Sequence, residues 1–433
     1  MFFLYTFLYT IVLALLFPFQ YLKRPRELRT KWVGERFGLI DDPATEKSSD
    51  IASTHYLQVQ ARGTVWVHSV SVGEVNAALP LLKALKKKYP SKRLILSTIT
   101  DTGQKVARQR SPEGTLTVYL PFDIPFMIRN ILKRVRPEML IVIETELWPN
   151  LFRIFKEYKI PILLLNGRIS ENSCKGYKKI SFFMKKVLDT VDFFGMQGQD
   201  DADRILEIGA DLSKVSTIGN FKFDTKPSSD IPEWTARISG PTLIAGSTHE
   251  GEEELVISVY ADLKKDFRNL NLIIAPRHPE RFRIVEELLT AKKIPYLKRS
   301  TFNTSRTEKN SIESQIILLD TIGELSSVYG ASDIAIIGKS FRGYGGQNPL
   351  EPACWGKPVV CGMHMENFPV IHDFIREGAA VQVTEEGLYT QIKELLSSPE
   401  HAQQMGEKAK EIFRKNAGAV GKAMEIIGNH MKK

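Results

Sequence analysis

A carboxylate at position 74 stands directly behind an apolar run and a glycine. Residues 65–70 are typical of a strand, and the apolar spacing after residue 74 is typical of a helix, so Glu74 should lie near a helix start. Gly73 permits the close approach of a ligand, and Glu74 could then take a proton from an acceptor hydroxyl as a general base. A carboxylate that merely caps the helix is the alternative.

Two further carboxylates, Glu144 and Glu146, follow the apolar run 140–143. Because side chains alternate along a strand, we expect both carboxylates on one face and Thr145 on the other. One of them could then act on a ligand while the second orients it. A structural ion pair with a lysine is the alternative.

The second half of the chain carries groups suited to phosphate and ribose. Arg277 and His278 end a strand-like run, where a guanidinium and an imidazole could meet a phosphate or a base, and a surface salt bridge of Arg277 is the alternative. The glycine-rich residues 343–351 include Pro349, which suits the first turn of a helix. Such a start offers backbone donors to anions, and Glu351 could accept ribose hydroxyls or simply cap the helix.

Metal chemistry has weaker support in the sequence. Asp201 and Asp203 have Asp-x-Asp spacing but stand in what resembles a helix start, and the eight histidines show no ligand spacing. We therefore expect no metal site.

These residues need a scaffold that brings them together, and the chain has the pattern of parallel βαβ units. Strand-like runs occur at 65–70, 94–98, 139–143, 162–165 and 215–218, and a second series at 243–245, 272–275, 316–319, 334–337 and 359–361. Prolines, serines and glycine crowd between 225 and 241 and interrupt both series. The prediction is an α/β fold of two doubly wound domains facing a cleft, with ligands at the carboxyl ends of the strands.

The first 19 residues carry no charged side chain and come close to the ~20 apolar residues that span a bilayer. Lys23, Arg24 and Arg26 follow, which predicts that the rest of the chain stays on the cytoplasmic side. No basic start or small-residue cleavage site marks a signal peptide. A single membrane span is the leading interpretation, and a helix lying in the membrane interface is the alternative.

Composition restricts the remaining classes. A formal net charge of +9 favours an anionic partner such as a membrane surface. The sequence has no basic, aromatic-interleaved repeat, so we do not expect nucleic acid as a partner. Three cysteines without metal-type spacing or a disulfide framework indicate a reducing compartment.

Taken together, several ordered motifs resemble the transferases of 3-deoxy-D-manno-oct-2-ulosonic acid (Kdo) in lipopolysaccharide assembly. They are HSVSVGE at 68–74, ETELWPN at 144–150, GNFKFD at 219–224, STHEGEE at 247–253, PRHPERF at 276–282 and GGQNPLEP at 345–352. The resemblance implies a GT-B fold, CMP-Kdo as donor and the lipid A precursor lipid IVA as acceptor. It further implies an inverting transfer without an essential metal or other cofactor, at the cytoplasmic face of the inner membrane.

The resemblance also assigns roles, carried over motif by motif. Glu74 would be the general base, and Glu144 and Lys222 would support the transition state. CMP would meet Arg277, His278, Ile322, Gly323, Glu324, Asn348, Pro349, Leu350 and Glu351, and the acceptor-side candidates are Glu35, Ser71, Gly73 and Glu146. Gln347 is a departure from the resemblance, because many members of the family have histidine beside the asparagine, and it affects a detail of the donor loop and not the class.

The expected organisation is an anchor at 1–22, an acceptor-binding domain at 23–225, a linker at 226–241 and a nucleotide-sugar domain at 242–433, whose last helix packs back on the first domain. A sugar-nucleotide epimerase is the main rival, because it shares the two-domain architecture but needs neither a lipid acceptor nor an anchor. A non-enzymatic nucleotide sensor at the membrane is the other rival, and it would leave Glu74 and Glu144 without a task.

Overall fold

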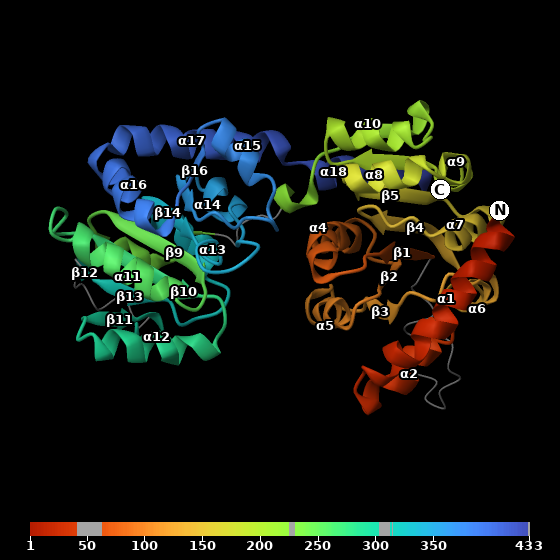
Figure 1. Cartoon of the computed structure of the whole chain (residues 1–433), viewed down its shortest axis with the longest axis horizontal. Helices are drawn as coiled ribbons and strands as arrows, with labels where there is room; N and C mark the ends of the chain where they lie inside the picture. The colour runs from red at the N-terminus through yellow and green to blue at the C-terminus, as the bar shows by residue number, and fades with distance from the viewer. Residues whose placement is uncertain (41–62, 225–229, 303–311, 314, 432–433) are drawn as a thin grey trace. The chain divides into compact units, whose positions relative to one another are not determined.

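A computed structural model describes residues 1–40, 63–224, 230–302, 312–313 and 315–431. The chain forms two compact units, each with its own parallel sheet and helices (Figure 1). The first unit comprises Met1–Thr225 and Ala417–Lys433, and the second Lys226–Asn416. The predicted α/β class is therefore confirmed. The segment from residue 417, which includes the last helix, belongs to the first unit, so the second unit ends at residue 416 and not at 433. Part of the expected join, 225–229, lies outside the described residues.

The first unit contains a seven-stranded parallel sheet in the order β3-β2-β1-β4-β5-β6-β7. Its strands are β1 (Thr64–His68), β2 (Arg93–Thr98), β3 (Leu116–Tyr119), β4 (Pro137–Ile143), β5 (Ile162–Gly167), β6 (Phe193–Met196) and β7 (Val215–Thr217). The chain moves outward from β1 to β3 and then returns to place β4 on the other side of β1. This reversal creates a topological switch point between β1 and β4, where open α/β sheets bind ligands.

Helices cover both faces of this sheet, so its strands are apolar on both sides. Val65 and Val67 enter one hydrophobic core, and Trp66, between them, enters the other. The covering helices are α4 (Val72–Lys88), α5 (Asp101–Arg110), α6 (Pro125–Val135), α7 (Pro149–Glu157), α8 (Glu171–Lys178), α9 (Ser181–Leu188) and α10 (Gln199–Glu207). The short 3-10 helices are η1 (Leu212–Lys214) and η2 (Phe221–Asp224).

The C-terminal helix α18 (Ala419–His430) completes the first unit. Its apolar side chains, including Ala423 and Ile427, join the core beside α4. The Asp224 carboxylate accepts hydrogen bonds from the backbone N–H groups of Gly418 and Val420. Asp224 therefore caps this helix from a distant part of the chain.

The second unit has a seven-stranded parallel sheet in the order β11-β13-β10-β9-β14-β15-β16 and a two-stranded ladder of β8 and β12. Its strands are β8 (Ile238–Ser239), β9 (Thr242–Thr248), β10 (Asn271–Pro276), β11 (Tyr296–Lys298), β12 (Ile312–Glu313), β13 (Ile316–Leu318), β14 (Ile334–Ile337), β15 (Val359–Cys361) and β16 (Ala380–Gln382). Its helices are α11 (Glu252–Leu263), α12 (Glu280–Ala291), α13 (Leu325–Val328), α14 (Leu350–Cys354), α15 (Ile371–Arg376), α16 (Glu385–Ser397) and α17 (Pro399–Asn416), with 3-10 helices η3 (Glu233–Arg237), η4 (Arg299–Thr301) and η5 (Tyr329–Ala331). The runs found in the sequence did not include strands β3, β6, β8, β11, β12 and β16.

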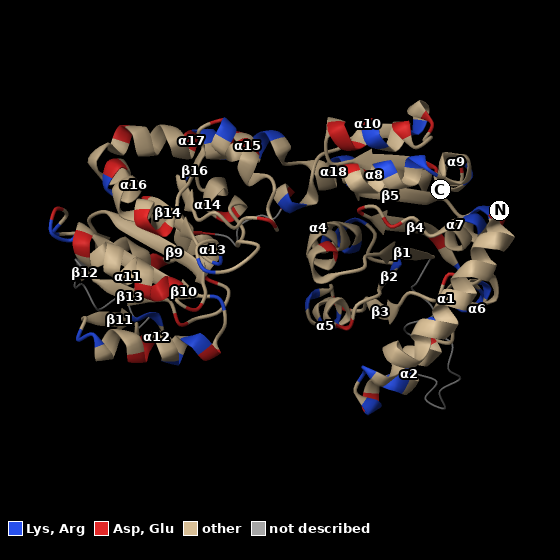
Figure 2. Cartoon of the chain, in the orientation of Figure 1, with Lys and Arg blue, Asp and Glu red and all other residues tan. Residues whose placement is uncertain are grey.

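The chain begins with α1 (Phe2–Leu22) and α2 (Arg26–Arg36). Among the described residues, α1 is the one helix long and apolar enough to cross a membrane, with a mean hydropathy of 2.1 over its best window. This classification uses only length and composition, and a signal sequence has the same two properties. In Figure 2, α1 shows no charged residue, whereas α2 carries several.

Candidate functional site

Three carboxylates gather at the switch point of the first unit. Glu74 follows β1, while Glu144 and Glu146 follow β4, the neighbouring strand. Burial, together with the negative charges of Glu74 and Glu144, raises the pKa of the Glu146 carboxyl to about 7. The structure therefore brings together the three carboxylates that the sequence singled out, and one of them can hold a proton near neutral pH.

Glu74 is held by its own helix start. Ser71 is the N-cap residue of α4, its hydroxyl donates to Glu74 Oε1 at 3.0 Å, and the Val70 N–H donates to Glu74 Oε2 at 2.6 Å. This is a capping-box arrangement, so the capping alternative describes part of what Glu74 does. Burial raises the pKa of Glu74, the Val70 bond lowers it, and the Glu144 charge raises it again. The carboxylate keeps further acceptor positions, so its role as a base stays a prediction.

The position of Glu144 beside the other two carboxylates does not follow from side-chain alternation along a strand. Strand β4 ends at Ile143, and Glu144 has a left-handed backbone with φ of 61°. The expectation that Glu144 and Glu146 share a strand face is therefore wrong, because the strand has ended before them. A left-handed glutamate is uncommon and costs free energy, and such residues cluster at functional sites.

Lys222 lies near Glu144, the residue with which the resemblance paired it. Burial raises the pKa of the Glu144 carboxyl, and the nearby positive charges of Lys222 and then Arg168 lower it. The neighbours of Lys222 in η2, Phe221 and Phe223, are both buried. Two buried aromatic anchors thus fix the turn that carries the lysine, which explains the alternation within GNFKFD.

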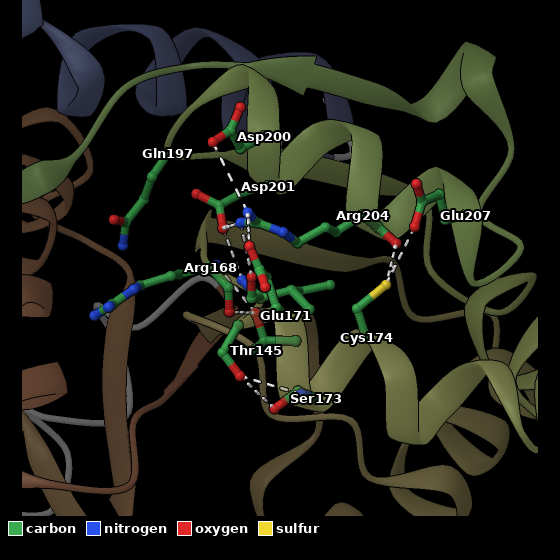
Figure 3. Close-up of polar contacts among 12 residues, drawn as sticks. Thr145, Arg168, Glu171, Ser173, Cys174, Gln197, Asp200, Asp201, Arg204 and Glu207 are labelled. Atoms are coloured by element: carbon green, nitrogen blue, oxygen red, sulfur yellow. Dashed lines mark hydrogen bonds and ion pairs between the residues drawn. The ribbon is translucent and has the colours of Figure 1, made fainter.

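Arg168 is a site residue that sequence reasoning missed. It follows β5, it is exposed, and its charge acts on Glu144. The Thr145 hydroxyl donates to the Arg168 carbonyl and accepts from the Arg168 N–H at 3.0 Å, so the backbone below the side chain is fixed. Figure 3 shows the guanidinium pointing away from the polar network around Asp201 and Arg204. A lone arginine after an apolar run was the only signal in the sequence.

The remaining acceptor-side candidate, Glu35, lies on α2 and is buried. Its carboxylate accepts the Tyr119 backbone N–H at 2.7 Å, and Lys31 lies 3.8 Å away. The bond from Tyr119 fastens α2 to the end of β3, whereas the Lys31 contact lies within α2.

In the second unit, Arg277 and Glu351 are brought together, as a nucleotide site requires. Burial raises the pKa of the Glu351 carboxyl, while a hydrogen bond from Asn348 and the Arg277 charge lower it. The Asn348 Nδ2 lies 3.3 Å from Glu351 Oε1. The His278 ring packs edge-on against the His249 ring at 5.5 Å. A cation, a carboxylate and two imidazoles thus gather at the carboxyl edge of the second sheet.

The glycine-rich loop before Glu351 has a packing reason for its glycines. Gly345 and Gly346 have φ of 110° and 63°. A Cβ at these positions would lie 2.1 Å from Asn367 Nδ2 and 2.3 Å from Met365 Sδ. Helix α14 then begins at Leu350, with Pro349 at its N-cap and Glu351 in its first turn. Because α14 has only 5 residues, its dipole is a weaker anion attractor than the sequence suggested.

The segment of Ile322, Gly323 and Glu324 is more open. The Ile322 side chain is 80% exposed, and Gly323 has a left-handed φ of 93°. Arg299 binds the Glu324 carboxylate through two bonds of 2.9 and 2.8 Å. The carboxylate of Glu324 is therefore engaged by the protein itself.

Glu252, the first acid of the pair in STHEGEE, supports the same edge of the second sheet. The buried Glu252 carboxylate accepts the backbone N–H groups of Lys339, Ser340 and Phe341. It thereby fixes the loop that leads from β14 into the glycine-rich segment. The run of acids at a helix start was a signal for this role, but the bonds join residues far apart in the chain.

The Asp-x-Asp pair is engaged by the protein. Asp201 accepts the Ile169 backbone N–H at 2.8 Å, and Asp203 accepts from Gln199 at the same distance. Within the described residues, no group of three or more His, Cys, Asp or Glu side chains is placed to hold a metal ion.

Comparison with known proteins gives consistent matches. A family model described as 3-Deoxy-D-manno-octulosonic-acid transferase (kdotransferase) matches residues 31–225. The 3-deoxy-D-manno-octulosonic acid transferase of Haemophilus influenzae is 33% identical over 378 residues, which cover 85% of this chain and 87% of that protein. The protein of the same name from Aquifex aeolicus is 32% identical over 353 residues, covering 81% of this chain and 91% of the relative.

Two solved structures share the architecture. A glycosyltransferase from Rickettsia africae has a TM-score of 0.51 at 18% identity and covers 86% of this chain and 99% of its own. UDP-GlcNAc 2-epimerase from Neisseria meningitidis has a TM-score of 0.53 at 13% identity, covering 85% and 99%. At these identities the likeness concerns the fold alone.

Proposed function

The chain belongs to the family of 3-deoxy-D-manno-octulosonic acid transferases, and we propose that it transfers Kdo from CMP-Kdo to the lipid A precursor lipid IVA, with inversion and without a metal. As a Kdo transferase it acts in lipopolysaccharide biosynthesis. The sugar-nucleotide epimerase and the nucleotide sensor are set aside, because relatives about one-third identical over most of the chain carry the transferase name. The observation that carries the proposal is the set of three carboxylates at the switch point.

The donor half of the proposal rests on the second unit. Arg277 supplies a guanidinium suited to the CMP phosphate, and Glu351 supplies a carboxylate suited to ribose hydroxyls. Their mutual electrostatic effect supports a common site. Asn348 already bonds to Glu351 and would orient it towards the sugar.

The chemical step rests on the first unit. Glu74 takes the proton from the lipid hydroxyl as its oxygen forms a bond to the anomeric carbon of Kdo. The bond from that carbon to the CMP phosphate oxygen breaks, and CMP leaves with the electron pair. Lys222 and Glu144 stabilise the charges that develop in the transition state. Arg168 adds a cation for the Kdo carboxylate or a lipid phosphate.

The catalytic units would act at the cytoplasmic face of the inner membrane. The apolar helix α1 and the basic residues after it support an anionic membrane surface as a partner. Separation of membrane and soluble fractions, with and without a salt wash, tests this location. Recovery of the whole protein in the soluble fraction would contradict it.

The experiment for the activity is CMP release from CMP-Kdo, measured with and without lipid IVA. A transferase that uses this acceptor releases CMP rapidly only when lipid IVA is present. Equal release in both reactions would indicate hydrolysis, and no release in either would refute the donor assignment. UDP-GlcNAc serves as the control donor, because the epimerase alternative predicts turnover of that nucleotide.

A further inference from the structure

Helix α1 has one face that packs on the first unit along its whole length. Its members are half-buried and recur at helical spacing: Phe2, Tyr5, Thr6, Tyr9, Leu13, Phe17 and Tyr21. We call them the docked face. In Figure 1, α1 runs along the first unit beside α7 and continues towards α2.

Polar bonds fasten the amino-terminal half of the docked face. The Asn150 Nδ2 donates to the Thr6 hydroxyl at 2.9 Å, and the Asp123 backbone N–H donates to the Tyr9 hydroxyl at 3.3 Å. Asn150 and the Asp123 side chain are buried and hold each other at the start of α7. A helix surrounded by lipid would not make such specific polar bonds to the rest of the protein, so these bonds indicate that this face of α1 is docked.

Aromatic packing fastens both ends. The Phe2 ring meets the Phe183 ring edge-on at 5.4 Å. Near the other end, the Phe17 ring stacks on Trp32 at 5.7 Å and meets Phe122 edge-on at 6.2 Å. The contacts thus extend from the first turn of α1 to its last turns.

The opposite face of α1 is an exposed apolar ridge. It consists of Phe3, Leu4, Phe7, Leu8, Ile11, Val12, Leu15, Leu16, Phe19 and Leu22. Phe3 is 85% exposed and Phe19 is 75% exposed. A continuous apolar surface of this length marks a membrane or protein contact.

Cations stand at both ends of this ridge. Beyond its carboxyl end lie Lys23, Arg26 and Lys31, all exposed. Beside its amino end, around the Phe2 contact with α9, lie the exposed cations Lys179, Lys185 and Lys186, together with the exposed apolar side chains of Ile180 and Phe182. Apolar side chains flanked by lysine and arginine match a leaflet that contains anionic lipid.

A docked α1 cannot cross the bilayer without taking charged groups with it. The Arg153 guanidinium lies 5.5 Å from the Phe2 ring, near one end. The Arg24 guanidinium lies 4.0 Å from the ring of Trp32, which packs on Phe17 near the other end. The buried Asp123 contacts the helix between them. With α1 perpendicular to the membrane, these groups would lie at three different depths in it.

We propose that α1 lies in the plane of the membrane, with its docked face on the first unit and its apolar ridge in a single leaflet of an anionic bilayer. The protein is then a monotopic membrane protein, which replaces the single-span interpretation of residues 1–22. The leaflet is the partner, and the flanking cations meet its headgroups. This topology is independent of which lipid accepts Kdo.

Depth measurement along the ridge tests the proposal. Leu4, Leu8, Ile11, Leu15 and Leu22 lie near one line along the helix, and each is replaced in turn by a nitroxide-labelled cysteine. The background is Cys354→Ser, because the other native cysteines are buried. In vesicles of phosphatidylethanolamine and phosphatidylglycerol, oxygen and nickel-chelate accessibilities should give one similar depth at all five positions. A depth that is greatest at Ile11 and shallow at Leu4 and Leu22 would overturn the proposal.

A second measurement tests docking in the membrane-bound full-length protein. The double variant Thr6→Cys, Asn150→Cys should be joined by a short bifunctional thiol reagent on those vesicles, since the native side chains are in contact. The matched control is Leu8→Cys, Asn150→Cys, in which the first cysteine lies on the ridge and should give little product. No cross-link in the Thr6 pair, in a protein that remains folded and bound, would mean that α1 leaves the unit and crosses the membrane.

Discussion

Replacement of Glu74 by Gln separates its two possible roles, since the capping role and the base role predict different losses. The carboxylate accepts one bond from the Val70 N–H and one from the Ser71 hydroxyl. Glutamine retains a single acceptor oxygen, so one of these bonds is lost. A hydrogen bond to a charged group contributes about 1.5–3 kcal/mol, and a lost helix cap costs typically ~1 kcal/mol. The free energy of unfolding should fall by about 1–3 kcal/mol.

The base role predicts a further loss that stability does not explain. Turnover at a temperature where the variant is fully folded should fall by roughly 10² to 10⁴, the range for a missing general base. Burial raises the pKa of Glu74, so the acidic limb of the wild-type rate profile should lie above the ordinary range of a glutamate. The variant should lack this limb.

The matched control removes a cap elsewhere. Thr384 is the N-cap of α16 and accepts the Gly387 N–H, as Ser71 does at the start of α4. Thr384→Ala should lower stability to a similar extent and leave turnover unchanged. Urea unfolding and CMP-release rates on both variants give the answer. Near-normal turnover in Glu74→Gln would mean that Glu74 only caps α4 and that Glu144 or Glu146 is the base.

Further variants test the remaining groups. Burial raises the folded-state pKa of Glu146 to about 7, so the folded protein binds this proton more tightly than the unfolded chain does. The stability that Glu146 contributes should be complete below its unfolded pKa and be lost as the pH rises through 7, by up to roughly 3 kcal/mol, and urea unfolding of Glu146→Gln should show a weaker pH dependence. Glu351→Gln should weaken CMP binding about tenfold or more in calorimetric titration, whereas the exposed Glu287→Gln should not, and equal affinities would move the nucleotide site elsewhere. Arg168→Ala should lower kcat/KM by roughly tenfold or more, with partial rescue by Arg168→Lys, if the cation meets a substrate anion, and unchanged kinetics would remove it from the site.

The fold could be predicted because the strands buried on both faces are continuous apolar runs. This pattern identified residues 139–143, which form the end of β4, and residues 334–337, which form the whole of β14. Strands such as β3 and β16 are short and only partly buried at the sheet edges, and their runs are too weak to detect. The carboxyl ends of the strands then located the candidate residues, because parallel topology gathers them at one edge.

The parts that could not be predicted depend on contacts between distant residues or on backbone geometry. No local pattern shows that Glu144 adopts a left-handed conformation after its strand ends. The Thr6 and Asn150 side chains are 144 positions apart in the sequence. Composition alone makes α1 look like an ordinary membrane span, because it does not reveal this contact. Asp224 caps a helix 194 positions away, a contact that no local pattern shows.

Transfer of Kdo to lipid IVA is tested by mass spectrometry of the lipid after incubation with the purified full-length protein and CMP-Kdo. We expect the lipid to gain the mass of one or more Kdo residues, and we expect Glu74→Gln, folded at the assay temperature, to give far less product in the same time. A lipid of unchanged mass, with CMP-Kdo intact or merely hydrolysed, would contradict the proposed donor and acceptor.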